Sequence, residues 1–121
     1  MNISKQELLS LRFDNDENIL QVICAEEAIA ILDFVRSKFA SDLPSKRKLA
    51  KHRSKGKGTQ AIHIAAATGN RYIIEVLMLD FESDPYELTS SNQTVIHCAA
   101  QRYEGVLSIF LFNRCHNIPV T

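Results

Sequence analysis

The chain has 121 residues, of which 45% are hydrophobic and 23% are charged, and its fourteen basic and fourteen acidic side chains cancel. This composition is ordinary for a single globular domain. The first twenty residues are too highly charged for a secretory signal, and no apolar run approaches the ~18 residues of a membrane span. Three cysteines without a CxxC pair argue against a disulfide framework and a structural zinc site, so we expect a cytoplasmic protein with reduced thiols.

The first predicted element is a short amphipathic lead-in helix within residues 2–12, whose apolar side chains are Leu8, Leu9 and Leu11. Aspartate and asparagine residues that follow it supply turn and capping chemistry. Across residues 19–39 the apolar positions recur largely at spacings of three and four residues. Because this is the period of helices that bury one face, this region is also predicted to be helical.

The next stretch, SKRKLAKHRSKGKG at residues 45–58, concentrates positive charge and has two glycines and little apolar content. Such a block is typical of a solvated, mobile segment, and we expect a flexible basic insertion at residues 41–57. The alternatives are contact with anionic lipid, contact with nucleic acid, or a nuclear localisation signal. No aromatic side chain is interleaved to stack on bases, which makes nucleic acid the weaker alternative. The basic residues of this segment are Lys46, Arg47, Lys48, Lys51, Arg53, Lys55 and Lys57.

A phrase is repeated in the second half of the chain, as AIHIAAATGN at residues 61–70 and VIHCAAQRYE at residues 95–104. Aligning His63 with His97 superposes two alanine pairs at an offset of 34 residues. Self-similarity at a period of about 33 to 34 residues marks a helical repeat array, in which alanines let helices approach closely and glycine or threonine caps them. The motif residues are His63, Ala65, Ala66, Gly69, Thr94, His97, Ala99 and Ala100.

This motif resembles the ankyrin repeat. The resemblance implies an all-α, ankyrin-like helical repeat solenoid of about three helix pairs, each preceded by a hairpin finger. The second repeat is expected to begin near Gly58, with its inner helix at residues 61–68 and its outer helix at residues 71–80. The third repeat is expected to have its outer helix at about residues 106–113.

Residues 19–39 fit the same template as a degenerate first repeat, with Gln21 at the histidine position. The separation from Gln21 to His63 is 42 residues, and the surplus is the basic segment, which then takes the place of the finger between repeats one and two. The predicted domains are a lead-in helix with a degenerate capping repeat at residues 1–40, the basic insertion at 41–57, and two ankyrin repeats at 58–121 that continue beyond the C-terminus.

The resemblance assigns His63 and His97 a structural role, in which each imidazole near a helix start hydrogen-bonds backbone or hydroxyl groups and ties a finger to its helix pair. A catalytic or metal-binding role would need converging partners, and the adjacent side chains of His97 and Cys98 diverge by about 100° on a helix. We therefore expect no catalytic residue, no metal and no cofactor. A zinc site assembled across repeats is the remaining alternative.

The third repeat, QTVIHCAAQRYEGVLSIFLF at residues 93–112, also resembles the N-terminal ankyrin array of membrane protein S-acyltransferases. That resemblance implies a substrate-recruiting segment on the cytosolic face of a membrane, although the chain contains no Asp-His-His-Cys string of its own. Our first hypothesis is a protein–protein interaction module with no catalytic activity and no small-molecule substrate, whose fingers and inner helices line a concave surface for a protein partner. The candidate contact residues are Ser90, Ser91, Asn92, Gln93, Gln101 and Arg102.

Overall fold

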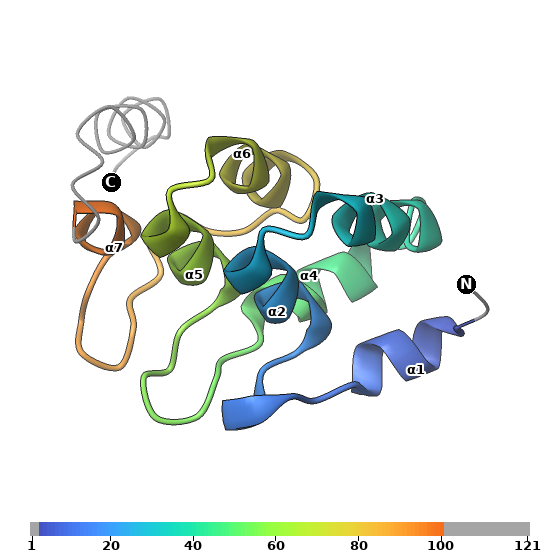
Figure 1. Ribbon diagram of the computed structural model, residues 1–121, viewed down its shortest axis with the longest axis horizontal. Helices are drawn as coiled ribbons and strands as arrows, with labels where there is room; N and C mark the ends of the chain where they lie inside the picture. Colours follow the sequence, from blue (N-terminus) through green and yellow to red (C-terminus); the bar gives the residue numbers. More distant parts are fainter. Residues whose placement is uncertain (1–2, 101–121) are drawn as a thin grey trace.

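The computed structural model describes residues 3–100, and this part of the chain contains seven α-helices, one short 3-10 turn and no strand (Figure 1). The predicted all-α class is confirmed. None of the helices within residues 3–100 is long and apolar enough to cross a membrane. The elements are α1 (Lys5–Ser10), the 3-10 turn (Asp14–Asp16), α2 (Ile19–Glu26), α3 (Ile29–Lys38), α4 (Leu43–Lys51), α5 (Ala61–Thr68), α6 (Arg71–Leu79) and α7 (Val95–Ala100).

The helices form two rows, with α2, α5 and α7 in an inner row and α3 and α6 in an outer row (Figure 1). We call α2 with α3 repeat one, and α5 with α6 repeat two. In each repeat a left-handed residue turns the chain from the inner to the outer helix, Glu27 with φ 53° and Gly69 with φ 79°. The predicted outer helix at residues 106–113 lies outside the described residues.

Small side chains let the inner row pack closely. Ala61, Ala65 and Ala66 are fully buried in α5, which contacts both α2 and α7. Bulkier aliphatic residues of the outer helices belong to the same core, so each repeat closes part of its neighbour's apolar face. These buried residues of the outer helices include Leu32, Val35, Ile73, Ile74 and Leu77.

Three hairpin-like fingers precede the inner helices, and each is closed by a backbone hydrogen bond between its ends. They are finger one (residues 13–17, 2.8 Å between N and O), finger two (residues 54–59, 2.9 Å) and finger three (residues 89–93, 3.0 Å). Neighbouring fingers are joined as well, because Lys55 N–H donates to Asn15 O over 2.8 Å and Ser90 N–H donates to Lys57 O over 2.9 Å. The fingers therefore stack in the same order as the helices.

Gly58 is needed at the junction between fingers two and three. Its φ of 60° lies in the left-handed region, and a Cβ added there would overlap the Ser90 hydroxyl oxygen. Gly56, in the same finger, also has a positive φ of 81°, but a Cβ there meets nothing within 4 Å. The close approach of fingers two and three thus depends on Gly58 and not on Gly56.

Helix α4 corrects the expectation of a flexible basic insertion at residues 41–57. Asp42 caps the helix by accepting from Ser45 N–H over 3.2 Å, and Pro44 lies in the first turn. Leu49 and Ala50 are 2% exposed and Lys46 is 5% exposed, so the helix packs one side against the rest of the protein. The finger between the repeats is made by residues 54–59, which include the end of the basic segment, and the predicted domain boundaries themselves stay a prediction.

Candidate partner-binding groove

His63 links the start of α5 to the chain just before finger three. Gln60 N–H donates to Nδ1 over 3.0 Å, so the ring proton is on Nε2, which donates to Glu87 O over 2.7 Å. The side chain is 1% exposed, and burial lowers the His63 pKa, with the nearby Arg53 charge acting in the same direction. The neutral imidazole is therefore the form that makes both bonds.

Gln21 makes the corresponding link in repeat one. Its Oε1 accepts from Asn18 N–H over 2.9 Å, and its Nε2 donates to Thr59 O over 2.8 Å and to His52 O over 3.2 Å. Gln21 and His63 both occupy the third position of an inner helix. Each supplies an acceptor to the helix start and a donor to the following finger region, so the amide replaces the imidazole.

His97 occupies the same position in α7. Its Nδ1 lies 3.2 Å from Thr94 N and 2.8 Å from Thr94 Oγ1, and Thr94 Oγ1 also accepts from His97 N–H over 3.1 Å. The structure thus places Thr94 at the helix start. His97 is exposed whereas His63 is buried, and of the alanine pair in α7 Ala99 is buried and Ala100 is exposed.

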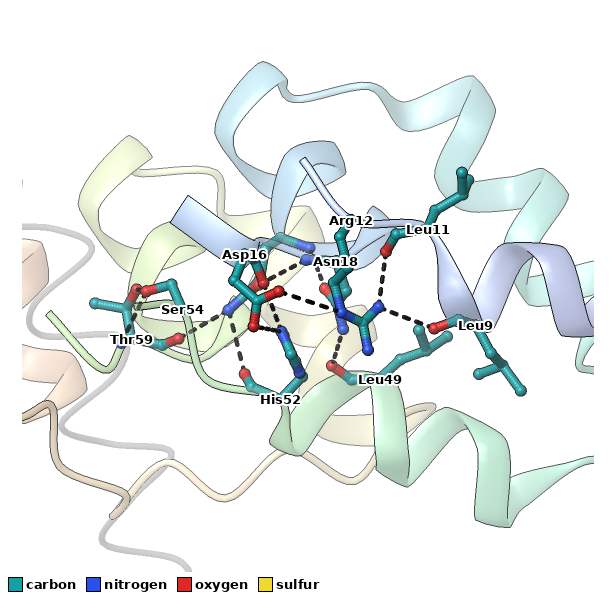
Figure 2. Close-up of polar contacts among 10 residues, drawn as sticks. Leu9, Leu11, Arg12, Asp16, Asn18, Leu49, His52, Ser54 and Thr59 are labelled. Atoms are coloured by element: carbon teal, nitrogen blue, oxygen red, sulfur yellow. Dashed lines mark hydrogen bonds and ion pairs between the residues drawn. The ribbon is translucent and has the colours of Figure 1, made fainter. Parts of the chain in front are cut away.

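A polar seam joins α4 to finger one and to the start of repeat one (Figure 2). Asn18 Nδ2 donates to Leu49 O over 2.9 Å, and His52 Nε2 lies 2.7 Å from Asp16 O, which places the His52 proton on that nitrogen. Both bonds are directed at backbone carbonyls, which have fixed positions. These two bonds consequently hold the C-terminal end of α4 and the start of finger two against finger one.

Three of the seven cations of the basic segment pair with carboxylates that follow α6. The pairs, with their nitrogen–oxygen distances, are Lys46–Asp80 at 2.8 Å, Arg47–Glu82 at 2.8 Å and Arg53–Glu87 at 3.0 Å. Asp80 also accepts from Arg36 over 3.1 Å. Burial opposes ionisation of Asp80, but the bonds from Lys46 and Arg36 lower its pKa, so the carboxylate stays charged at neutral pH.

The other four cations have no carboxylate within 4.0 Å among residues 3–100, and they divide between two places. Lys48 and Lys51 lie on α4, beside a depression that α4 forms with the end of α1. Lys55 and Lys57 are exposed on finger two. Paired and unpaired cations thus occur both on α4 and after it, a division that the even basic composition of the segment does not reveal.

A groove of about 630 Å³ runs between the fingers and the inner helices. All three fingers contribute to its wall, and the charged residues that line it are Glu17 of finger one with Lys55 and Lys57 of finger two. Its floor comes from α2, α5 and α7 and consists mostly of small or apolar side chains, together with His63 and Thr68 of α5. The floor residues include Ala25, Ile64, Ala67 and Cys98.

The predicted contact residues lie partly in this groove. Gln93 lines it, and its neighbours Ser90, Ser91 and Asn92 are exposed on finger three, where Asn92 has the positive φ of 60° expected for the turn. Gln101 and Arg102 lie outside the described residues. Lys55 and Lys57 also line the groove, and they were not among the predicted contact residues because their segment was interpreted as a flexible insertion, although its two glycines were a signal for a finger.

The groove offers surfaces for binding, and the described residues show no reactive group beside it. Within residues 3–100 no group of three or more histidine, cysteine or acidic side chains is placed to hold a metal ion. Cys24 and Cys98 are free, and burial raises the pKa of both thiols, which disfavours the nucleophilic thiolate. Both ring nitrogens of His63 already bond to the backbone.

Comparison with solved structures supports the fold. The chain is similar to yeast Yar1, whose crystal structure was determined in complex with the ribosomal protein Rps3. Yar1 is described there as the chaperone of Rps3. The TM-score is 0.84 and the sequence identity is 15%, and the match covers 100% of this chain and 82% of that chain. Yar1 is an ankyrin-repeat protein, so the likeness shows the ankyrin-repeat fold here. No family model matches the chain, and no curated protein matches it. None of these comparisons supports the resemblance to S-acyltransferase arrays.

Proposed function

We propose that this chain is an ankyrin-repeat protein interaction module whose groove holds a segment of a protein partner, and that it catalyses no reaction itself. The observation that carries the proposal is the groove, which spans three fingers and three inner helices. Its small apolar floor leaves room for a polypeptide backbone, while the wall supplies hydrogen-bonding and charged groups that fix its register. The two free thiols agree with a cytoplasmic location.

The likeness to Yar1 supports a protein as the kind of ligand. Yar1 is named as the chaperone of a ribosomal protein. At 15% identity the likeness carries the fold alone, so the proposal extends to a protein partner and not to Rps3 itself. A ribosomal protein is one candidate among the partners that the following experiment can identify.

Site-specific photo-cross-linking tests the proposal. Benzoylphenylalanine placed at Gln93, in the groove wall, is expected to cross-link a discrete protein in cell extract, which mass spectrometry then identifies. The matched control is benzoylphenylalanine at Ala30, which is exposed on the outer helix α3. Equal products from both positions, or a product from Ala30 alone, would show that the groove is not the interaction surface.

The two other hypotheses from the sequence have less support. Docking of the basic segment on anionic lipid or nucleic acid would rely on seven cations, of which three are already paired with carboxylates. The hypothesis of a substrate-recruiting arm for a membrane S-acyltransferase rests on residues 93–112, of which the structure describes only residues 93–100. Sequencing past Thr121 tests it, since an Asp-His-His-Cys motif among hydrophobic helices would support it.

A further inference from the structure

We propose that finger two makes the groove selective for an acidic segment of the protein partner, with Lys55 and Lys57 as the groups that receive its carboxylates. This inference rests on the proposed function and adds the charge of the ligand to it. The first support is the division of the basic segment. Lys46, Arg47 and Arg53 are paired with carboxylates of the chain itself, whereas Lys55 and Lys57 are exposed and have no carboxylate within 4.0 Å among residues 3–100.

The two lysines are mounted on a fixed backbone. Lys55 N–H donates to Asn15 O over 2.8 Å, and Lys57 O accepts from Ser90 N–H over 2.9 Å, so finger two is held on both sides by its neighbours. Gly58 permits the second of these approaches. A charged group on a rigid finger loses less freedom on binding than one on a mobile segment, which favours recognition.

The charge of the groove itself is positive beside finger two. Among residues 3–100, Glu17 is the one acidic residue that lines it, against Lys55 and Lys57, and the imidazole of His63 is neutral. The Lys57 charge acts on the Cys98 thiol in the floor, favouring its ionised form against the larger opposing effect of burial on the pKa. Lys57 and the floor residue Cys98 line the same groove, so a carboxylate on a segment bound there lies within the field of the Lys57 charge.

Lys48 and Lys51 provide a matched control from the same basic segment. They are exposed and carry the same charge, but they line the depression between α1 and α4 together with Leu9 and Arg12, and do not line the groove. Neutralising either pair removes two positive charges from the molecule. A difference between the two double variants thus reports where the acidic ligand sits, and not the net charge of the protein.

The experiment measures fluorescence anisotropy of labelled short peptides, one of alternating glutamate and alanine and one of alternating lysine and alanine. The proteins are the natural sequence, the double variant Lys55→Gln/Lys57→Gln and the double variant Lys48→Gln/Lys51→Gln, with folding checked by circular dichroism. We expect the glutamate peptide to bind about fivefold more weakly to the finger variant, the combined effect of two exposed ion pairs. The α4 variant should bind it within about twofold of the natural sequence.

The inference is overturned if both double variants lose the same affinity for the glutamate peptide, or if the finger variant loses none. It is also overturned if the natural sequence binds the lysine peptide more tightly than the glutamate peptide, or binds the two equally. Cross-linking from Gln93 separates this from the proposed function. If Gln93 captures a partner and the finger variant still binds that partner equally well, acidic selectivity is wrong and the interaction module stands. If Gln93 captures no protein, the module itself is wrong, whatever the peptides do.

Discussion

Repeat one and repeat two solve the same structural problem with different side chains. In repeat two the neutral imidazole of His63 accepts from Gln60 N–H and donates to Glu87 O. In repeat one the amide of Gln21 accepts from Asn18 N–H and donates to the carbonyl oxygens of His52, within the basic segment, and Thr59, directly after it. The third position of an inner helix therefore needs a side chain with one hydrogen-bond acceptor and one donor, and glutamine supplies both as well as histidine does.

The comparison also shows how the long insertion is tolerated. Between the repeats the chain adds α4, yet Gln21 still reaches Thr59 O over 2.8 Å at the end of finger two. Helix α4 is packed beside the two repeats and bonded to them, so the finger that follows it keeps its place in the stack. The insertion of α4 returns the chain to the position where finger two starts, so repeats one and two stay in contact.

The largest effect is expected from a charge placed in the inner row. Ala66→Glu buries a carboxylate in the fully buried face of α5, and should lower the free energy of unfolding by more than about 3 kcal/mol. Urea denaturation followed by circular dichroism measures it. The control in repeat one is Ala25→Glu, an exposed position of α2, with an expected change within about 1 kcal/mol. Equal losses would contradict the packing described here.

The link residues come next. His63→Ala leaves the buried Gln60 N–H and the partly buried Glu87 O without their partner, and should cost about 2 to 4 kcal/mol of unfolding free energy. His63→Gln, which copies the repeat-one solution, should recover at least half of that loss in the same denaturation measurement. If the glutamine variant is as unstable as the alanine variant, the two repeats do not share one solution.

The ion pairs that hold α4 rank third. Asp80→Asn leaves the Lys46 ammonium, whose side chain is 7% exposed, without its carboxylate, and should cost about 2 kcal/mol. Glu82→Gln breaks a pair whose side chains are 47% and 48% exposed, and should cost less than about 1 kcal/mol. Thermal or urea unfolding distinguishes them. A larger effect of Glu82→Gln would mean that the basic helix is held by its surface pairs.

The smallest effect is a pH dependence confined to repeat two. Burial lowers the pKa of His63 in the folded state. As the pH falls below 6.5, His63 is therefore protonated in the unfolded chain before it is protonated in the folded chain, and the free energy of unfolding decreases. The stabilising contribution is fully present above pH 6.5. Measuring unfolding free energy on both sides of that pH should show a steeper decline for the natural sequence than for His63→Gln. Parallel declines would exclude His63 as the cause.

Local signals predicted the second repeat almost residue for residue. The inner helix expected at residues 61–68 is Ala61–Thr68, and the outer helix expected at residues 71–80 is Arg71–Leu79, with Asp80 as its C-cap. Glycine at a helix end and small apolar residues at helical spacing act within a few residues, so the sequence displays them directly. In finger three, Asn92 has a positive φ of 60° and Gln93 lines the groove, whereas the role of both residues in partner contact stays a prediction.

By itself, the sequence determined the repeat, its period and the position that Gln21 and His63 share, because these features follow from neighbouring residues and simple spacing. Only the tertiary structure decided that residues 43–51 form a helix, which cations are paired and which face the groove. Lys46 meets Asp80, and Asn15 meets Lys55, across separations that no local pattern records. Composition described the basic segment as one block, whereas the structure divides it into a packed helix, α4, and a finger whose two lysines line the groove.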